Sequence, residues 1–288
     1  MARLKGNDNV GLAIAIALVL VAVVIVFVWL FAWRGAEAGT VDSLAAGPEI
    51  AILETTTSAV TTSTTVLKLP PLQTIGSSIQ GRPIELYTFG SGSWRVLFIG
   101  GVHGNEYGGP VARRFLRYLL EHPEAVPADA FVQLIPSANP DGEEAGTRGN
   151  ANSVDLNRNL PSENWREKLN AGDRPTSGLT GGPSPGSEPE TKALLSILGE
   201  GWDVVISLHS SGGIIDPDGN GVGLAIAERM SAVCGMPVSG LDYQQYITGS
   251  LGVFMPERYQ VPVITLELNS TDLTEGLRDA LLSALTRV

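Results

Sequence analysis

Cysteine, histidine and basic side chains are all scarce in this sequence of 288 residues. The single cysteine, Cys234, excludes a disulfide within the chain. It falls in a predicted helix and is expected to be a small buried hydrophobe. Lys and Arg number 19 against 30 Asp and Glu, for a net charge of −11. Because so acidic a chain cannot offset repulsion from phosphates, nucleic acid is excluded as an expected partner.

Charged side chains are missing altogether from Val10 to Trp33, a stretch of 24 residues. As a helix it would extend about 36 Å, enough to cross a bilayer core of about 30 Å. Two basic residues precede the stretch and one follows it closely, which predicts a cytoplasmic tail at residues 1–9. A cleaved signal peptide is the alternative, since residues 36–38 look like a cleavage site, but signal cores are shorter. We therefore predict a single-pass cell-membrane protein whose bulk is extracytoplasmic.

Residues 34–68 lack a sustained apolar period, and nine of the eleven residues from Thr55 to Thr65 are Thr or Ser. Such a segment buries too little apolar surface to offset its chain entropy. It is predicted to be an extended or disordered stalk, with a Thr-rich strand as the alternative. Residues 69–288 are then long enough for one folded domain.

Strand and helix patterns alternate through residues 69–288. Short apolar runs bounded by polar residues and glycines predict strands at 84–89, 96–99, 131–135, 204–208 and 263–268. Helices are predicted at 111–120, 190–198, 224–234 and 273–286. This alternation predicts an α/β fold with a mixed, largely parallel sheet covered by helices on both faces.

Two of the three histidines come just after apolar strands. His103 follows the second predicted strand, with Glu106 three positions on, and His209 follows the fourth. Ligands bind beyond the carboxyl ends of strands in open α/β sheets, and two imidazoles with one carboxylate leave a zinc position open for catalysis. A structural histidine that bonds a loop carbonyl is the alternative for His209. The third histidine, His122, ends a predicted helix, where it suits the helix dipole.

Glu267 interrupts an otherwise apolar strand, where a carboxylate is costly unless it has a partner or a function. Strand alternation places it on one face with Thr265. Close to an activated water it would serve as a general base, whereas a solvent-facing glutamate on an edge strand is the alternative. The polar loop at 147–161 carries Arg148 and Arg158, whose guanidinium groups match carboxylates, although a solvated loop is the plain alternative.

Taken together, these motifs resemble those of the zinc carboxypeptidase family. They are, in chain order, H-x-x-E at 103–106, N-P-D-G at 139–142, the segment around Arg148, D-L-N-R-N at 155–159, His209 after a strand, and Glu267. The resemblance implies a zinc carboxypeptidase-like fold and a single Zn²⁺ ion. It implies metal ligands at His103, Glu106 and His209, a general base at Glu267, a cation at Arg148 that polarises the scissile carbonyl, and a clamp for a substrate carboxylate at Asn157 and Arg158.

Within this family the chain is most similar to the murein peptide amidases, which cleave the amide between γ-D-glutamate and meso-diaminopimelate. Residues 148–165, 180–191 and 249–252 carry the similarity. Leu160 departs from the aromatic residue usual after N-R-N, and Tyr243 and Tyr246 are loosely placed counterparts of the substrate-covering tyrosine of digestive carboxypeptidases. The resemblance implies a membrane-anchored zinc hydrolase acting on peptidoglycan stem peptides. A general zinc carboxypeptidase on L-peptides and a non-catalytic cell-wall peptide-binding protein stay open.

Overall fold

The computed structural model describes residues 49–51, 66–68, 71–169, 178–219, 221–240 and 247–288. The predicted cytoplasmic tail and membrane helix, most of the stalk, and Tyr243 and Tyr246 lie outside these residues, so those expectations stay predictions. Within the described part of the chain, no helix combines the length and the apolar character needed to cross a bilayer. Inside the predicted stalk, β1 (Glu49–Ala51) pairs antiparallel with β2 (Val66–Lys68), which the sequence did not predict.

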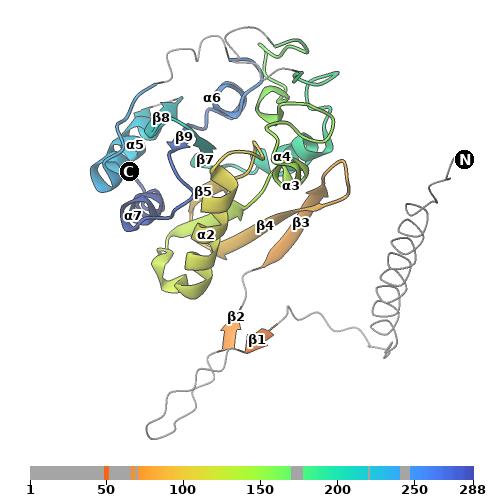
Figure 1. The fold of residues 1–288 in the computed structure, drawn as a ribbon. Coiled ribbons are helices and arrows are strands. Elements are labelled where there is room, and N and C mark those ends of the chain that lie inside the picture. Colours follow the sequence, from red (N-terminus) through yellow and green to blue (C-terminus); the bar gives the residue numbers. More distant parts are fainter. Residues whose placement is uncertain (1–48, 52–65, 69–70, 170–177, 220, 241–246) are drawn as a thin grey trace, which may run out of the picture. The chain divides into compact units, whose positions relative to one another are not determined.

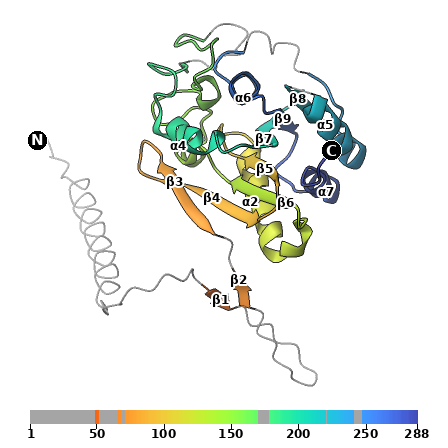
Figure 2. The ribbon, with the colours of Figure 1, turned by 180° about the vertical axis from the view of Figure 1, so that it is seen from behind.

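A seven-stranded mixed sheet organises the main body of the molecule (Figures 1 and 2). Its order is β3-β4-β6-β5-β7-β9-β8. The four strands β6, β5, β7 and β9 are parallel neighbours, while β3, β4 and β8 join antiparallel at the two sides. The strands are β3 (Leu72–Ser77), β4 (Pro83–Gly90), β5 (Trp94–Ile99), β6 (Ala130–Ile135), β7 (Val204–Ser210), β8 (Ile214–Asp218) and β9 (Val263–Leu268).

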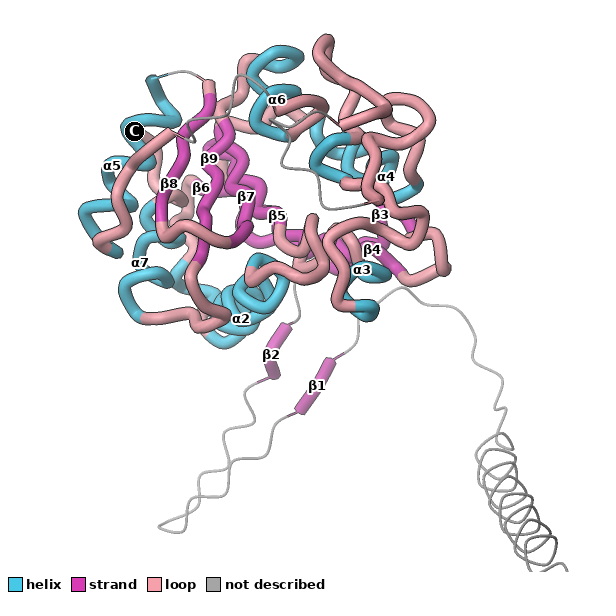
Figure 3. Tube along the Cα trace, turned by 45° about the horizontal axis from the view of Figure 1, so that its top comes forward, coloured by secondary structure: helices cyan, strands magenta, loops and turns pink. Residues whose placement is uncertain are grey.

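Helices cover both faces of this sheet, as Figure 3 shows. One hydrophobic core lies between the sheet and α2 (Gly108–Glu121), α5 (Gly221–Cys234) and α7 (Glu275–Ser283). The other lies under α4 (Pro189–Leu198) and α6 (Leu251–Tyr259). The central strands therefore bury both faces, which is why β5 and β7 read as continuous apolar runs. The predicted mixed α/β sheet is confirmed.

In the part of the main body that the structure describes, two further strands and two α-helices escaped the sequence prediction: β3, β8, α3 (Pro140–Ala145) and α6. The N-P-D-G motif at 139–142 begins α3, because Asn139 caps this helix with its side chain and proline suits the first helical position. In β8, Pro217 breaks the strand pattern, but an edge strand tolerates proline because one side needs no ladder. Pro256 similarly obscures α6.

Candidate active site

Neighbouring parallel strands bring the two predicted histidine loops together. In the ladder between β5 and β7, Ile99 lies opposite Ser207, so the two strands end at the same edge of the sheet. The chain then turns at Gly101, whose φ of 62° lies in the left-handed region that glycine adopts without strain. His103 and His209 consequently meet at that edge although 106 positions separate them.

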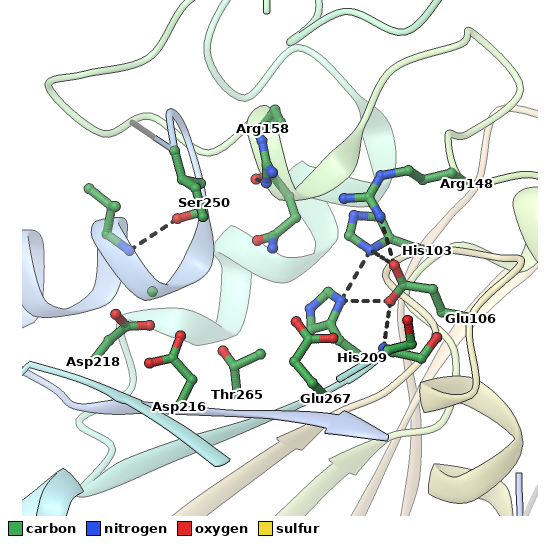
Figure 4. A pocket seen from close by; sticks show the side chains of 16 residues that line it. His103, Glu106, Arg148, Arg158, His209, Asp216, Asp218, Ser250, Thr265 and Glu267 are labelled. Atoms are coloured by element: carbon green, nitrogen blue, oxygen red, sulfur yellow. Dashed lines mark hydrogen bonds and ion pairs between the residues drawn. The ribbon is translucent and has the colours of Figure 1, made fainter. Parts of the chain in front are cut away.

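Three side chains converge there at distances suited to one metal ion (Figure 4). His103 Nδ1 lies 2.9 Å from Glu106 Oε1. His209 Nδ1 lies 2.9 Å from Glu106 Oε2 and 3.1 Å from His103 Nδ1. His209 thus faces a carboxylate rather than the loop carbonyl of the structural alternative. The structure brings together the three ligands that the resemblance implied.

Asp155 fixes the orientation of the first imidazole. Its Oδ1 lies 2.9 Å from His103 Nε2, and both side chains are buried. A carboxylate at Nε2 favours the tautomer with the proton on that nitrogen, so the Nδ1 lone pair faces Glu106 and His209. Sequence reasoning quoted Asp155 within a motif but gave it no role. The available signal was its position two residues before the predicted clamp at Asn157.

Compensating charges keep the carboxylates of this cluster ionised. Burial alone would raise the pKa of Glu106, but the two facing imidazoles lower the pKa below its ordinary value. Burial would likewise raise the pKa of Asp155, yet His103, Arg158 and Arg148 hold it well below the usual range. For His103, burial opposes the charged form, while Glu106 and Asp155 raise the pKa. A permanently ionised carboxylate beside oriented imidazoles is a donor set that a divalent cation needs.

The donor set fits zinc in particular. Zn²⁺ takes nitrogen and oxygen ligands at about 2.0–2.1 Å, which places tetrahedral neighbours about 3.3 Å apart. The donor atoms of His103, Glu106 and His209 all lie within 4.8 Å of one another, and the three facing pairs are 2.9, 2.9 and 3.1 Å apart. Three protein ligands also leave the fourth position for a reactant, as in catalytic zinc sites.

Glu267 stands beside the cluster on the neighbouring strand. In the ladder between β7 and β9 it lies opposite His209. Because β9 lies between β7 and β8, the edge-strand alternative for Glu267 is wrong. The predicted alternation is confirmed, since Thr265 and Glu267 line the cavity while Ile264, Leu266 and Leu268 enter the core. Burial raises the pKa of Glu267, and the neighbouring Glu106 adds to the shift against the lowering influence of His209.

Arg148 spans the two carboxylates of the cluster. Its Nε donates to Asp155 Oδ2 at 2.9 Å and its Nη1 donates to Glu106 Oε1 at 2.6 Å. These two bonds hold the guanidinium group of Arg148 among the residues that line the cavity. The geometry is compatible with the predicted contact to a carbonyl oxygen.

The predicted clamp residues line the same cavity. Arg158 is buried, and its Nη1 donates to the carbonyl oxygen of Asn157 at 2.7 Å. The side chain of Asn157 accepts from the backbone N–H of Leu251 at 2.9 Å, which ties this segment to the start of α6. Both residues line the cavity, so all seven predicted site residues share one pocket.

The cavity also contains residues that sequence reasoning missed. Asp216 and Asp218 of β8 line it, and the backbone N–H of Ser210 donates to Glu106 Oε2 at 3.1 Å. The signal for the aspartates was an acidic pair next to the apolar Ile214-Ile215, the same anomaly that singled out Glu267. The acidic pair was not recognised as part of the site because the strand that carries it was not predicted.

Comparisons with known proteins agree with this geometry. A family model described as zinc carboxypeptidase matches residues 63–216, about half of the chain. The murein peptide amidase A of Escherichia coli K12 is 34% identical over 151 residues, which are 49% of this chain and 59% of that protein. The murein peptide amidase A of Vibrio campbellii is 30% identical over 221 residues, or 69% of this chain and 80% of that protein.

A solved structure extends the comparison to the fold. The murein-tripeptide amidase of Escherichia coli O157 superposes with a TM-score of 0.59 at 26% identity, covering 75% of this chain and 92% of that one. The alignment with the K12 relative spans less than two thirds of that relative's length, and Glu267 lies beyond the family match.

Proposed function

This chain belongs to the zinc carboxypeptidase family, and from that membership and the cavity we propose that it hydrolyses amide bonds in peptidoglycan stem peptides. The bond we propose joins γ-D-glutamate to a diamino acid such as diaminopimelate. The observation that carries the proposal is one cavity lined by a metal-binding cluster, a buried carboxylate and an arginine clamp. Similarity to proteins named murein peptide amidase supports the choice of substrate.

Each residue of the cavity then has a part in the reaction. Zinc held by His103, Glu106 and His209 would supply Lewis acidity at the scissile carbonyl. Glu267 takes a proton from the attacking water and delivers it to the leaving amine as the C–N bond breaks. Arg148 donates a hydrogen bond to the carbonyl oxygen as negative charge develops there.

Arg158 and Asn157 select which peptides react. A guanidinium fork pairs with a carboxylate through two parallel hydrogen bonds, so the released residue is held by its free carboxylate. This makes the activity that of an exopeptidase or terminal amidase. A general carboxypeptidase that cleaves L-peptides would use the same residues. Similarity to carboxypeptidase N catalytic chains supports this activity as the second candidate function.

The test is direct hydrolysis by the purified full-length chain. It is incubated with zinc and either L-Ala-γ-D-Glu-diaminopimelate or an all-L tripeptide that ends in a free carboxylate, and the products are identified by mass. We expect release of diaminopimelate, faster than any cleavage of the L-peptide, and loss of both after chelation. Preference for the L-peptide would support the general carboxypeptidase instead, and zinc binding without cleavage of either would support a binding protein.

We also propose that residues 10–33 anchor the chain and that residues 34–68 link the anchor to an extracytoplasmic catalytic domain at residues 69–288. The uncharged stretch and the positive charge before it support this arrangement. The check is to extract membranes from cells that express the chain with and without residues 1–34. We expect only the complete chain to require detergent, and release of the complete chain by alkaline carbonate would reject the anchor.

A further inference from the structure

A buried polar cluster joins the loop that carries Arg148 and Asp155 to the first turn of α4. Its members are Asn150, Glu188 and Glu190, which are 5%, 2% and 0% exposed. None of these three residues is among those that line the cavity, and the proposed hydrolysis gives them no part. Two carboxylates buried side by side are costly unless hydrogen bonds replace the lost solvent, so the cluster calls for an explanation.

The side-chain amide of Asn150 uses all of its hydrogen-bonding capacity. Its Nδ2 donates to Glu188 Oε2 at 2.8 Å and to Glu190 Oε2 at 3.1 Å. Its Oδ1 accepts from the backbone N–H groups of Asn152 at 3.0 Å and Val154 at 3.1 Å. An amide offers two donors on nitrogen and two acceptor sites on oxygen, so all four are satisfied. An ionised aspartate has the same shape but could not donate to either carboxylate.

The backbone held by Asn150 leads directly to two residues of the site. It closes into a turn, because the N–H of Asn150 donates to the carbonyl oxygen of Val154 at 2.9 Å. Arg148 lies two positions before Asn150, and Asp155 directly follows Val154. Arg148 Nε donates to Asp155 Oδ2, and Asp155 Oδ1 faces His103 Nε2. A displacement of this turn would therefore move Arg148 and Asp155 relative to the metal-binding cluster.

The two glutamates attach this turn to the body of the fold. Glu188 is the N-cap residue of α4, and Glu190 is the second residue of that helix. Glu190 Oε1 also accepts from the backbone N–H of Ile79 at 3.1 Å, in the turn between β3 and β4. Ser187 Oγ donates to Glu188 Oε1 at 2.6 Å. Because α4 packs into the second hydrophobic core, the cluster ties the loop to elements that the core holds in place.

Metal binding by this cluster does not fit the orientation of the amide. Asn150 Oδ1 faces two backbone N–H groups, so its NH₂ group must face Glu188 and Glu190. Hydrogens therefore point at the two carboxylates, whereas a cation needs lone pairs from every neighbour. The cluster is thus a tie between segments of the chain.

We propose that Asn150 is a positioning residue which, through the two buried glutamates, sets where Arg148 and Asp155 lie at the active site. The inference rests on the proposed function for the part of Arg148 and on the metal site for the part of Asp155. Asn150 acts on the metal through the imidazole that Asp155 orients, and on the reaction through Arg148. Substrate binding should depend on it less, because Asn157 is tied separately to the start of α6.

The experiment compares Asn150→Ala with Asn152→Ala in the full-length chain. Asn152 Nδ2 also donates to Glu188 Oε2, at 2.9 Å, so its loss removes a bond to the same carboxylate and leaves the amide of Asn150 in place. We expect Asn150→Ala to lower kcat on the stem tripeptide by about 10²-fold, the effect of a displacement of about 1 Å, with KM nearly unchanged. Zinc affinity should fall by about 10-fold. Asn152→Ala should change neither.

Glu190→Gln and Glu188→Gln form a second pair, which serves if Asn150→Ala does not fold. Glu190 accepts at both oxygens, so a glutamine there sets an N–H group against the N–H of either Ile79 or Asn150. Glutamine at position 188 can keep its oxygen toward the asparagine amides and donate to Ser187 Oγ. We expect Glu190→Gln to reproduce both losses, and Glu188→Gln to remain close to the original chain.

Zinc affinity separates this inference from the proposed function, because competition with a chromophoric chelator needs no turnover. Weaker zinc binding in Asn150→Ala or Glu190→Gln, with the two control variants unchanged, supports the positioning role even if no peptide is cleaved. Folded variants that lose stability in urea but keep the original zinc affinity overturn it even if the original chain cleaves the stem tripeptide. The cluster would then serve stability alone.

Discussion

The two ends of the cavity treat their carboxylates in opposite ways. At the histidine end, Glu106 and Asp155 are surrounded by imidazoles and by Arg148, which hold both pKa values below their ordinary range. At the β8 end, burial and the neighbouring Asp216 raise the pKa of Asp218 to about 8. Imidazoles and a guanidinium group stabilise the ionised carboxylates at the first end, whereas burial at the second end favours the protonated carboxyl of Asp218. One pocket therefore contains carboxyl groups that ionise at very different pH.

The largest expected effect lies between the two ends, at Glu267. Replacing it with Gln removes proton transfer and should lower kcat by about 10²–10⁴-fold. Zinc content should be unchanged, because Glu267 is not among the three converging ligands. Turnover on the stem tripeptide and metal content are measured together, with Glu200→Gln as the surface control. Turnover comparable to the original chain would show that Glu267 is not the base.

Asp155→Asn tests whether zinc binding depends on the carboxylate that faces His103 and Arg148. The amide no longer matches the charge of His103 and Arg148, so the imidazole is less firmly oriented. We expect zinc affinity to fall by about 10–100-fold, the usual cost of losing such a supporting carboxylate. Competition with a chromophoric chelator measures it, and Asp272→Asn serves as the matched charge control. An affinity equal to that of the original chain would mean that His103 needs no such support.

Arg158→Lys tests whether the guanidinium group of Arg158 binds the terminal carboxylate of the substrate. A point charge cannot reproduce the fork, so KM for a peptide with a free terminal carboxylate should rise by about 10–100-fold. The same peptide with its terminus amidated should change little. If both peptides are impaired equally, the assignment of the carboxylate clamp is wrong.

Asp218→Asn sharpens the comparison through stability. Unfolded Asp218 ionises near its ordinary pKa of 3.8, whereas in the folded chain the pKa is about 8. Between those pH values the folded chain retains a proton that the unfolded chain has lost, so the free energy of unfolding falls as pH rises. Asparagine removes this contribution, whose slope is at most about 1.4 kcal/mol per pH unit.

Urea unfolding at about pH 5 and about pH 8 measures this slope in both chains. We expect the variant to gain stability relative to the original chain as pH rises. A constant difference between the two chains would mean that Asp218 ionises normally in the folded protein.

The central strands of the sheet could be predicted from the sequence, whereas edge strand β8 could not. Strands β5, β7 and β9 are buried on both faces, so their apolar runs are unmistakable, and predictions there agree with the structure to within two residues at each end. Edge strand β8 needs no such run and contains Pro217. Losing β8 from the prediction meant losing Asp216 and Asp218.

The site itself was predictable only in part from physical patterns. Strand ends followed by His103 and His209 could be read from the sequence, but that β5 and β7 are neighbours is a property of topology. The family resemblance supplied this missing link, and the family match confirms that resemblance and the zinc-dependent hydrolase class that it implied. The roles of Glu267, Arg148, Asn157 and Arg158 stay predictions. Asp155 was missed because its role depends on a contact 52 residues away in the chain.

Gly252 offers a simple route by which the shape of this pocket could change. A methyl group there would meet the Asp218 carboxylate, which is the far end of a side chain rather than backbone. Alanine at this position would therefore push the carboxylate aside and leave the fold in place. One nucleotide change in a glycine codon would therefore be enough to move the Asp218 carboxylate and reshape that end of the pocket.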